Sequence, residues 1–339
     1  MSQPKVAVVI LNWNGKNWLE RFLPSVLGSS YSNLEIIVGD NASSDDSMAF
    51  LQTYYKQVRI VQNAVNGGYA KGYNDCLKHV QADYYILLNS DIEVPSRWIE
   101  PVIELMESDK NIAACQPKIL QYADKTKFEY AGACGGFMDH LGYMFCRGRI
   151  FDECETDNGQ YDTAIETFWA TGACLFVRAE TYWQAGGLYE PLFAHMEEID
   201  LCWRLKNLGH KIYVCPQSSV YHVGGGTLHK TSPRKTFLNF KNNLIIVLRN
   251  LPAGLAFRVL FLRLMLDGIA ATRTATKGEF AAAWAIVRAW VSFVGSMGKW
   301  RRERPQGKSL STHSGIYRKS ILSQYFYYKK RMFSELGWL

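Results

Sequence analysis

Short apolar runs alternate with amphipathic helical segments in the first quarter of the chain, and this alternation constrains the fold most strongly. The runs at residues 6–11, 34–38, 58–61 and 84–88 have the length and β-rich composition of buried strands. Strands and helices that alternate at this spacing are typical of βαβ units with right-handed crossovers. The sequence therefore predicts an α/β fold with a mostly parallel central sheet flanked by helices.

After residue 95 the pattern becomes less regular. A helix is expected over residues 98–106, and residues 121–165 should form hairpins and loops. An amphipathic helix is expected from residue 197, because Leu201, Leu205 and Leu208 recur at helical spacing. Strands are expected at 113–120 and 174–177, with two further short strands at 212–214 and 218–222.

Polar side chains follow the first strands at the points where these strands end. They are Asn12 and Asn14, Asp40, the segment from Asn66 to Asn74, and Asn89 with Asp91. Because neighbouring parallel strands end at one edge of a sheet, we expect these residues to converge on a ligand site. Gly67 and Gly68 would let a ligand approach the backbone closely. Asp91 would suit a divalent cation that bridges two phosphates, and the other polar side chains could bind a base or ribose.

Two familiar nucleotide sites are unlikely on sequence grounds. Neither GxGxxG nor GxxxxGK[ST] occurs, which argues against dinucleotide-binding and P-loop sites. The eight cysteines form no CxxC pair, and several lie in apolar runs as buried thiols do. The amino terminus leads into a strand without a secretory apolar region. We therefore expect a reduced, cytoplasmic protein.

The two parts of the chain carry opposite charge. Residues 1–225 hold 18 Lys and Arg against 27 Asp and Glu, whereas residues 226–339 hold 20 against 4. An acidic part favours metal ions as ligands, and a basic, aromatic-rich part favours anionic partners. Nucleic acid is a weaker candidate than anionic lipid, because no recognised nucleic-acid-binding motif accompanies the basic clusters at 299–304 and 329–331.

From residue 236 onward the sequence predicts helices with mixed apolar and basic positions. Charged residues interrupt the apolar stretches at 251–271 and 280–298, so neither is a clean membrane-spanning segment. The pattern favours amphipathic helices that lie in a membrane interface, with a helical lid on the first domain as the alternative. We expect a catalytic domain over residues 1–228 and a basic helical region over 229–339.

Taken in order and spacing, the motifs of residues 5–225 resemble the family 2 glycosyltransferases of GT-A fold, particularly the rhamnosyltransferase-like branch. The resemblance rests on residues 8–15 (VVILNWNG), 38–45 (VGDNASSD), 66–70 (NGGYA), 88–91 (LNSD), 171–173 (TGA) and 197–204 (EEIDLCWR). It implies a hexosyltransferase that transfers a sugar from a nucleotide-sugar with inversion, usually with Mg²⁺ or Mn²⁺. We favour dTDP-rhamnose or a UDP-sugar as donor. The acceptor would be a glycan or lipid-linked hydroxyl in cell-surface polysaccharide synthesis, met at the inner face of the cell membrane.

The resemblance also assigns roles to the donor-side residues. Asp40 should hold the nucleotide base with Asn12 and Asn14 nearby, and the donor pocket should be lined by Asn66, Gly68 and Asn74. Asn89-Ser90-Asp91 occupies the family's Asp-X-Asp position, so Asp91 should bind the metal. His222 matches a late His that completes the metal site in parts of the family. Asn89 is a weaker, neutral ligand, and whether it touches the ion is open.

The catalytic base is expected at the start of the helix that begins near residue 197. Glu198 matches the base position, with Glu197 and Asp200 as competitors; capping of the helix dipole is the simpler explanation for three acids in a first turn. A carboxylate there would take the proton of the acceptor hydroxyl. Trp169, Thr171 and Gly172 should shape the acceptor side, although Trp169 could instead belong to the core.

Two other functions remain open at this point. A sugar nucleotidyltransferase would need a Gly-rich loop with Lys or Arg after the first strand, and Asn12-Trp13-Asn14-Gly15-Lys16 is a poor substitute. A catalytically silent scaffold of a membrane assembly would use the basic tail as its working surface. The presence of Asp91, Glu198 and His222 argues against the scaffold.

Overall fold

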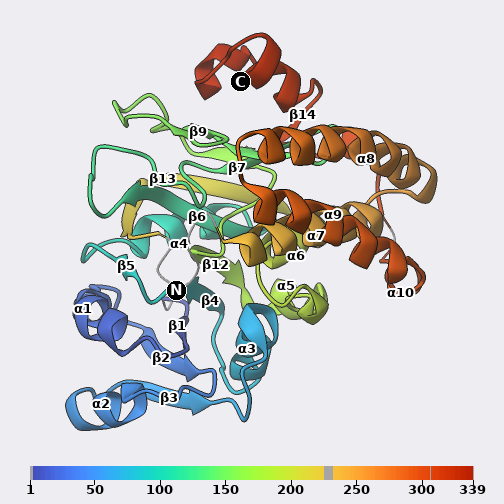
Figure 1. The fold of residues 1–339 in the computed structure, drawn as a ribbon. Coiled ribbons are helices and arrows are strands. Elements are labelled where there is room, and N and C mark those ends of the chain that lie inside the picture. The colour runs from blue at the N-terminus through green and yellow to red at the C-terminus, as the bar shows by residue number, and fades with distance from the viewer. Residues whose placement is uncertain (1–2, 225–231, 306, 339) are drawn as a thin grey trace.

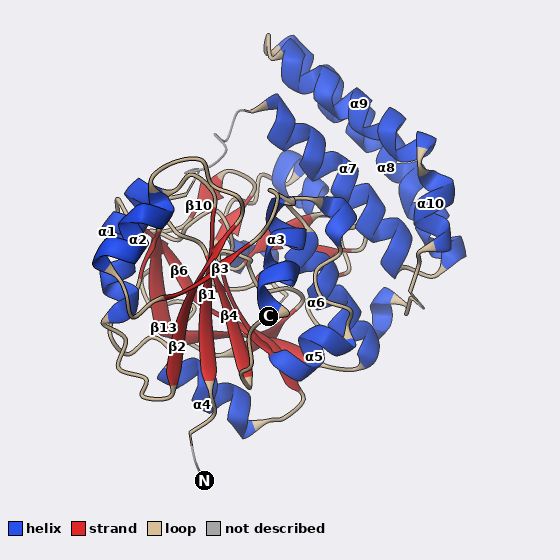
Figure 2. Cartoon of the chain, turned by 90° about the horizontal axis from the view of Figure 1, so that it is seen from below, coloured by secondary structure: helices blue, strands red, loops and turns tan. Residues whose placement is uncertain are grey.

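A computed structural model describes residues 3–224, 232–305 and 307–338 of the chain. An α/β unit makes up the larger part of the molecule, and a layer of carboxyl-terminal helices lies along one side of it (Figures 1 and 2). The domain boundary predicted at residues 228 and 229 lies outside the described residues.

The first half of the central sheet is parallel, as the sequence predicts. Strands β1 (Val6–Asn12), β2 (Leu34–Asp40), β3 (Arg59–Gln62) and β4 (Tyr84–Leu88) lie in the order β3-β2-β1-β4. All three neighbouring pairs are parallel, and the β1–β2 register places Asn12 opposite Asp40. Helices α1 (Lys16–Leu27), α2 (Ser47–Tyr54) and α3 (Gly68–Leu77) connect these strands. The polar residues that end β1, β2 and β4 therefore share one edge of the sheet.

The second half of the sheet is mixed. Strand β12 (Cys174–Arg178) lies antiparallel between β4 and β6 (Ile112–Gln121), and β13 (Lys211–His222) runs parallel to β6. The edge strand β11 (Ile165–Thr167) and the short β5 (Ile92–Glu93) both pair antiparallel with β13. The prediction of two short strands here was wrong, because β13 passes through Pro216 with a register shift between Cys215 and Ser219. Helices α4 (Glu100–Ser108), α5 (Ala179–Gln184) and α6 (Glu197–Leu208) complete the unit, with a 3₁₀ turn at Glu190–Leu192.

Residues 121–165 form a second, smaller sheet, as expected for hairpins. Its strands are β7 (Gly136–Asp139), β8 (Met144–Cys146), β9 (Arg149–Ile150) and β10 (Glu153–Cys154). Strand β14 (Ile316–Tyr317), near the carboxyl end of the chain, adds to it in parallel with β7. Asp139 accepts a hydrogen bond from the Ile321 backbone N–H at 2.9 Å and so holds the returning chain.

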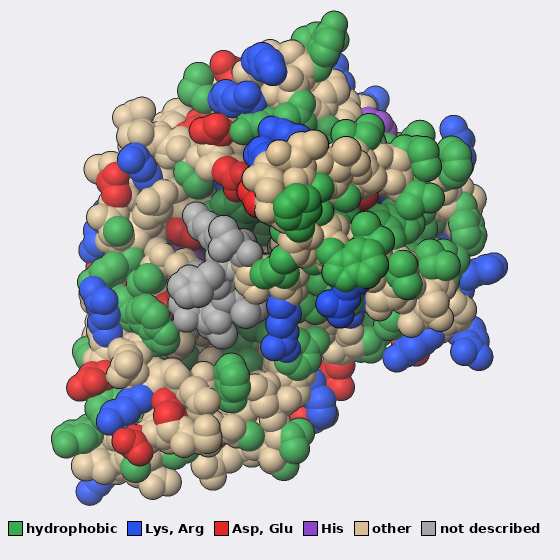
Figure 3. Space-filling view, in the orientation of Figure 1, with side chains coloured by type: hydrophobic (Ala, Val, Ile, Leu, Met, Phe, Trp, Pro, Cys, Tyr) green, Lys and Arg blue, Asp and Glu red, His purple; other side chains and the backbone are tan. Residues whose placement is uncertain are grey.

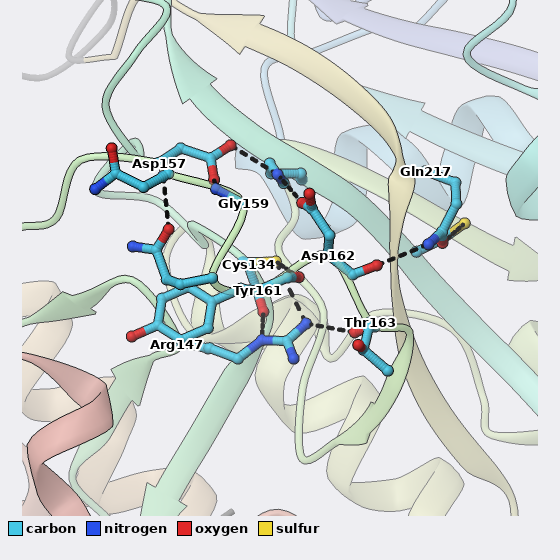
Figure 4. Close-up of polar contacts among 12 residues, drawn as sticks. Cys134, Arg147, Asp157, Gly159, Tyr161, Asp162, Thr163 and Gln217 are labelled. Atoms are coloured by element: carbon cyan, nitrogen blue, oxygen red, sulfur yellow. Dashed lines mark hydrogen bonds and ion pairs between the residues drawn. The ribbon is translucent and has the colours of Figure 1, made fainter.

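Ion pairs of Lys118 fasten residues 121–165, here called the insertion, to the central sheet, and contacts of Arg147 hold the insertion together internally (Figure 4). Lys118 on β6 is 5% exposed, and its ammonium contacts Asp157 at 2.6 Å and Asp162 at 2.5 Å. The Arg147 guanidinium donates to the carbonyls of Cys134 at 3.1 Å and Thr163 at 3.0 Å. The buried charges of Lys118 and Arg147 therefore both have polar partners, as a folded interior requires.

The carboxyl-terminal layer consists of α7 (Pro233–Asn250), α8 (Ala253–Thr276), α9 (Phe280–Gly295) and the short α10 (Met297–Arg302). Helix α7 is the inner member and packs on α6, while α8 and α9 lie outside it. Two polar side chains of α8 face the inside of the layer. Arg263 is 2% exposed and donates to Asn243 Oδ1 at 2.6 Å. Asp267 accepts from Tyr143 at 2.9 Å and from the Trp290 indole at 3.0 Å.

The outward side of α8 and α9 is apolar. We call it the apolar face; its exposed residues are Phe257, Phe261, Leu262, Leu264, Met265 and Ile269 of α8, and Phe280, Trp284, Val287, Val291 and Val294 of α9, each between 40% and 71% exposed. Figure 3 shows these hydrophobic side chains gathered where Figure 1 places α8 and α9, with Lys and Arg around them. In the described parts of the chain, the helices are all too short or too polar to cross a membrane.

Candidate active site

The loops after β1 and β2 bring the first predicted donor-side residues together. The Asn12 amide donates to Ser43 Oγ at 3.1 Å, and Asn14 Oδ1 accepts from the Ser44 backbone N–H at 2.7 Å. Asp40 is 3% exposed and receives only long contacts from the Ser43 N–H, at 3.3 and 3.4 Å. Asn12 Oδ1 is buried and finds no hydrogen-bond partner among the described residues. Asn12 Oδ1, and the Asp40 carboxylate with its long contacts, are therefore available to accept hydrogen bonds from a ligand.

Asn41, which the sequence analysis did not single out, ties the donor-side loops to each other. Its amide nitrogen donates to Asn66 Oδ1 and to the Gly68 carbonyl, both at 3.0 Å. Asn66 Oδ1 also accepts the Gly68 N–H at 2.9 Å. The structure therefore places Asn66 and Gly68 next to the loop after β2, in line with the predicted convergence. The Asn-rich composition of these loops was the available signal for the network.

The turn after β4 meets the end of β13. His222 Nε2 lies 3.2 Å from Asp91 Oδ1 and 3.5 Å from the Asn89 amide nitrogen, although 131 residues separate His222 from Asp91. His222 Nδ1 lies 3.1 Å from a carboxylate oxygen of Glu129, which belongs to the insertion. Sequence reasoning missed Glu129, because no motif surrounds it. The predicted pair of Asp91 and His222 is brought together in a buried position, 7% and 5% exposed.

The charges of this cluster stabilise one another. Burial disfavours the imidazolium of His222, but the contacts with Asp91 and Glu129 outweigh burial and raise the pKa of His222 to about 10. Burial likewise acts to raise the pKa of Asp91, and the contact with His222 more than compensates, so that the pKa of Asp91 is lowered.

Asp91 and His222 fit a divalent metal ion whose remaining ligands come from elsewhere. A carboxylate and an imidazole side by side suit Mn²⁺, and Glu129 behind the ring would orient it. Binding of the ion would displace the proton that His222 otherwise holds between the two carboxylates, because only the neutral imidazole is a ligand. Within the described ranges, no three His, Cys, Asp or Glu side chains are grouped to hold a metal ion on their own. Phosphate oxygens of a substrate and water would have to complete the coordination, as is usual for Mg²⁺ sites at diphosphates.

Glu197 and Glu198 begin α6, and both carboxyl groups are buried. Burial raises the pKa of both carboxyl groups, and the neighbouring charge of Glu198 raises the pKa of Glu197 further. One oxygen of each, Oε2, is buried without a hydrogen-bond partner in the part of the chain that the structure describes. A carboxylate with a raised pKa and an unused oxygen is suited to accept a proton.

Gly172 lies against Glu198. A Cβ added at Gly172 would lie 3.5 Å from Glu198 Cγ and 3.0 Å from the Tyr69 hydroxyl. That hydroxyl donates to the Gly172 carbonyl at 2.6 Å. The Tyr69 ring contacts the Tyr73 ring in a tilted arrangement, with 4.7 Å between the ring centres, and the Tyr73 hydroxyl donates to the Leu88 carbonyl at 3.1 Å. Two tyrosines of α3 thus connect the Glu198 side of the site with the end of β4.

Asp200 is not placed as a catalytic base. It is 0% exposed, and it accepts from Arg204 Nε at 2.7 Å and from the Asn250 amide at 2.8 Å. A carboxylate held by two buried donors has a structural role, because moving it would leave Arg204 unpaired. Of the three predicted carboxylates, Glu197 and Glu198 remain as candidates.

Two predicted acceptor-side residues also belong to the interior. Trp169 is 4% exposed, and its indole N–H donates to the Phe137 carbonyl at 3.0 Å, so its ring offers no face to a sugar. Thr171 is 2% exposed, and its hydroxyl accepts from the Ala173 N–H at 3.1 Å. Thr171 therefore shapes the turn that carries Gly172, and Trp169 takes the alternative that the sequence left open for it, a position in the core.

Asn74 is a further correction. It is 5% exposed, and its amide donates to the Leu188 carbonyl at 2.8 Å while its oxygen accepts from Tyr182 at 2.6 Å. Both ends of the amide are committed to the protein. Asn74 lies inside α3 and faces α5 instead of lining a donor pocket.

Comparison with known proteins places the site in context. Residues 7–157 match the family model described as glycosyl transferase family 2. Over 231 residues the chain is 23% identical to the N-acetylglucosaminyl-diphospho-decaprenol L-rhamnosyltransferase of Mycobacterium tuberculosis. The aligned region covers 63% of this chain and 75% of that protein. The chain spans between 26% and 44% of the length of other curated relatives that it matches.

Solved structures show the same fold. GalNAc-T7 with UDP, GalNAc and Mn²⁺ superimposes with a TM-score of 0.59 at 18% identity, over 73% of this chain and 48% of that one. The mannosyltransferase PcManGT from Pyrobaculum calidifontis, in complex with GDP-Man and Mn²⁺, gives 0.55 at 13% identity over 87% and 88%. Both neighbours are GT-A glycosyltransferases, so the predicted fold class is confirmed.

Proposed function

We propose that this chain, which carries a glycosyl transferase family 2 domain over residues 7–157, transfers a sugar with inversion from a nucleotide-diphosphate sugar to an acceptor hydroxyl. The observation that carries the proposal is the pairing of two clusters: Asp91 with His222, and Glu198 with Gly172. One cluster suits a metal-bound diphosphate and the other suits removal of a proton, and Tyr69 and Tyr73 connect them.

In this mechanism the acceptor oxygen attacks the anomeric carbon as the bond from that carbon to the diphosphate oxygen breaks. Glu198 takes the hydroxyl proton, and the transition state has oxocarbenium character. Asp91 and His222 would hold Mg²⁺ or Mn²⁺, which when bound neutralises the charge of the departing diphosphate. Glu197 is the alternative base, since it shares the environment of Glu198.

The donor-side residues would select the nucleotide. Asp40 and Asn12 offer acceptors for the N–H groups of a base or the hydroxyls of a ribose, and Asn14 shapes their loop. Asn66 and Gly68 would lie along the donor, and Asn89 beside the metal. We favour dTDP-rhamnose or a UDP-sugar, in keeping with the rhamnosyltransferase relative and with the neighbour that binds UDP.

We further propose that the acceptor is a glycan or a lipid-linked sugar of cell-surface polysaccharide synthesis, met at the inner face of the cell membrane. The apolar face supports a peripheral membrane contact. Its large side chains, such as Phe261 at 67% and Trp284 at 61% exposure, form the kind of exposed apolar patch that marks an interaction site. Exposed cations on the same helices and the link between them, Arg258, Arg273, Lys277 and Arg288, would meet anionic headgroups.

The most direct test is nucleotide binding followed by transfer. UDP, dTDP and GDP are each added with Mn²⁺ in a thermal-shift measurement, and the sugar donors of the binding nucleotide are then assayed for hydrolysis and transfer. We expect one nucleotide to raise the unfolding midpoint. No binding and no turnover of any donor would favour the scaffold, and formation of a nucleotide-sugar from a sugar phosphate would favour a nucleotidyltransferase.

Asp91→Ala should abolish metal-dependent transfer, a loss of at least about 10³-fold, because it removes the charged ligand of the site. Circular dichroism should show that the variant stays folded, and Mn²⁺ should no longer enhance nucleotide binding. Asp46→Ala, at an exposed position in the loop after β2, is the control. Full activity of the Asp91 variant would contradict the assignment of the metal site.

A further inference from the structure

The turn that leads into Glu197 has an unusual backbone. Phe193, His195 and Met196 have φ values of 62°, 68° and 73°, in the left-handed region that residues with a side chain rarely adopt. Glu197 and Glu198 follow directly at the start of α6. A backbone of this kind persists only where its surroundings hold it in place. The orientation of both glutamates therefore depends on what holds this turn.

Asn242 of α7 holds the turn with one amide group. Its Nδ2 lies 2.8 Å from each of three backbone carbonyl oxygens, those of Leu192, Ala194 and His195. Asn242 is 0% exposed, so these contacts are shielded from water. An amide has two N–H donors, and here both are directed at a segment of the chain about fifty residues away.

The same turn contacts the donor side of the site. The Phe193 carbonyl accepts the backbone N–H groups of Tyr69 at 2.7 Å and Ala70 at 3.3 Å, in the first turn of α3. Gly68 packs so tightly there that an added Cβ would lie 2.5 Å from the Phe193 ring. Displacement of the turn would therefore disturb the first turn of α3 together with the start of α6.

A second contact of α7 reinforces the first. Asn250 lies eight residues after Asn242, on the same side of the helix, and its amide donates to Asp200 Oδ1 at 2.8 Å. The guanidinium of Arg249 lies 3.4 Å from the centre of the Tyr189 ring, just before the turn. Helix α7 thus contacts the chain on both sides of the two glutamates.

We propose that Asn242 is a positioning residue for the catalytic glutamates. Helix α7 then contributes to the active site by holding the turn that precedes them. Asn242 acts through the 193–196 turn, which sets the direction in which α6 presents Glu198. This inference rests on the proposed role of Glu198 as the base.

The test compares Asn242→Asp with Asn242→Ala. Asp has the shape of Asn but places a carboxylate against three carbonyls, whereas Ala only removes the donors. If Asn242 positions the turn by donation, Asp should lower kcat by about 10²-fold and Ala by less, with a smaller change in the KM of the donor. If Asn242 merely fills space, Asp would be the milder variant. Asn239→Ala, at a half-buried position of the same helix, is the matched control.

Hydrogen exchange followed by mass spectrometry tests the same point without a donor. In both Asn242 variants the amides of residues 193–200 should exchange faster than in the Asn239 control, while those of β1 and β4 stay protected. This readout with the Ala variant suffices if the Asp variant does not fold. Unchanged exchange and unchanged kcat in a folded Asn242 variant would overturn the proposal.

The two hypotheses fail differently. Full activity of Glu198→Gln would refute the proposed base, whatever the Asn242 variants do. Loss of activity in Glu198→Gln together with control-like behaviour of Asn242→Asp would refute the positioning role alone.

Discussion

The α/β unit and the helical layer both bury apolar side chains, but they differ in where their charged and large exposed apolar side chains lie. The sheet of the α/β unit is covered by apolar residues, and its functional polar groups lie at one edge. Helix α8 also buries apolar side chains, among them Val259 and Leu260. It differs in turning Arg263 and Asp267 inward with them, while Phe261 and Ile269 stay exposed. A helix that faces water normally shows the opposite arrangement. The exposed apolar side chains of the layer are what the proposed membrane contact would require.

Glu198→Gln tests whether the chemistry belongs to the α/β unit alone. We expect turnover to fall by about 10²–10⁴-fold, because the amide cannot accept the hydroxyl proton, with nucleotide affinity and membrane binding retained. Initial rates and thermal shifts measure these effects. Glu180→Gln on the exposed side of α5 serves as control. Near-normal turnover of the Glu198 variant would move the base to Glu197.

Asp267→Ala and Phe261→Ala compare the two sides of α8. Removal of Asp267 leaves the buried guanidinium of Arg263 without its carboxylate at 3.3 Å, and breaking such a pair costs about 3–5 kcal/mol. Truncation of exposed Phe261 should change the free energy of unfolding by no more than about 0.5 kcal/mol. Urea denaturation followed by circular dichroism measures both. If both variants changed the free energy of unfolding equally, the placement of Asp267 on the buried side and Phe261 on the exposed side of α8 would be contradicted.

The apolar face is tested by a triple substitution, Phe261→Glu, Ile269→Glu and Trp284→Glu. In flotation with vesicles that contain phosphatidylglycerol, the membrane partition coefficient should fall by about 10²-fold or more, since each large side chain contributes about 1.5–3 kcal/mol when removed from water. Tyr54→Glu, which changes an aromatic residue of α2 that is 70% exposed, is the matched control. Unaltered flotation would show that this face is not the membrane contact.

The smallest expected effect is a shift of the pH profile. Since burial raises the pKa of Glu198, the carboxylate should become protonated, and kcat should fall, at a pH above the range of an ordinary glutamate. Substitutions on the apolar face should not change the pH at which kcat falls. A kcat profile that stays flat through the ordinary glutamate range and above it would argue against Glu198 as the base.

Much of the sheet edge was predictable because it depends on local patterns. The ends of β1, β2 and β4 follow from apolar runs that stop at Asn or Asp, and parallel order then brings these residues together. His222 and Asp91 were paired by resemblance, and their contact at 3.2 Å depends on the long strand β13, which the sequence showed as two pieces. The strand was predicted as two pieces because Pro216 interrupts the hydrogen-bond ladder without ending the strand.

The residues whose placement the sequence left open, misjudged or missed have one thing in common: their placement depends on contacts between distant segments. Trp169 and Asn74 are residue types that suit a pocket as well as an interior, and only tertiary contacts decide which way they face. Asp200 was chosen for its position in the first turn of α6, but its partner Asn250 lies fifty residues away. Glu129 and Asn242 carry no motif at all, because their importance comes from the segments that they touch. Contacts of this range cannot be read from periodicity or spacing.

The return of the chain through β14 has a consequence for orientation. The helical layer is attached to the α/β unit at its beginning through α7 and again beyond its end through the β14–β7 pairing. A segment fixed at both ends cannot swing as a hinged arm. If the apolar face rests on a bilayer, the catalytic edge of the sheet is then held at one height and tilt above the lipid, and only acceptors that extend to that height would be glycosylated.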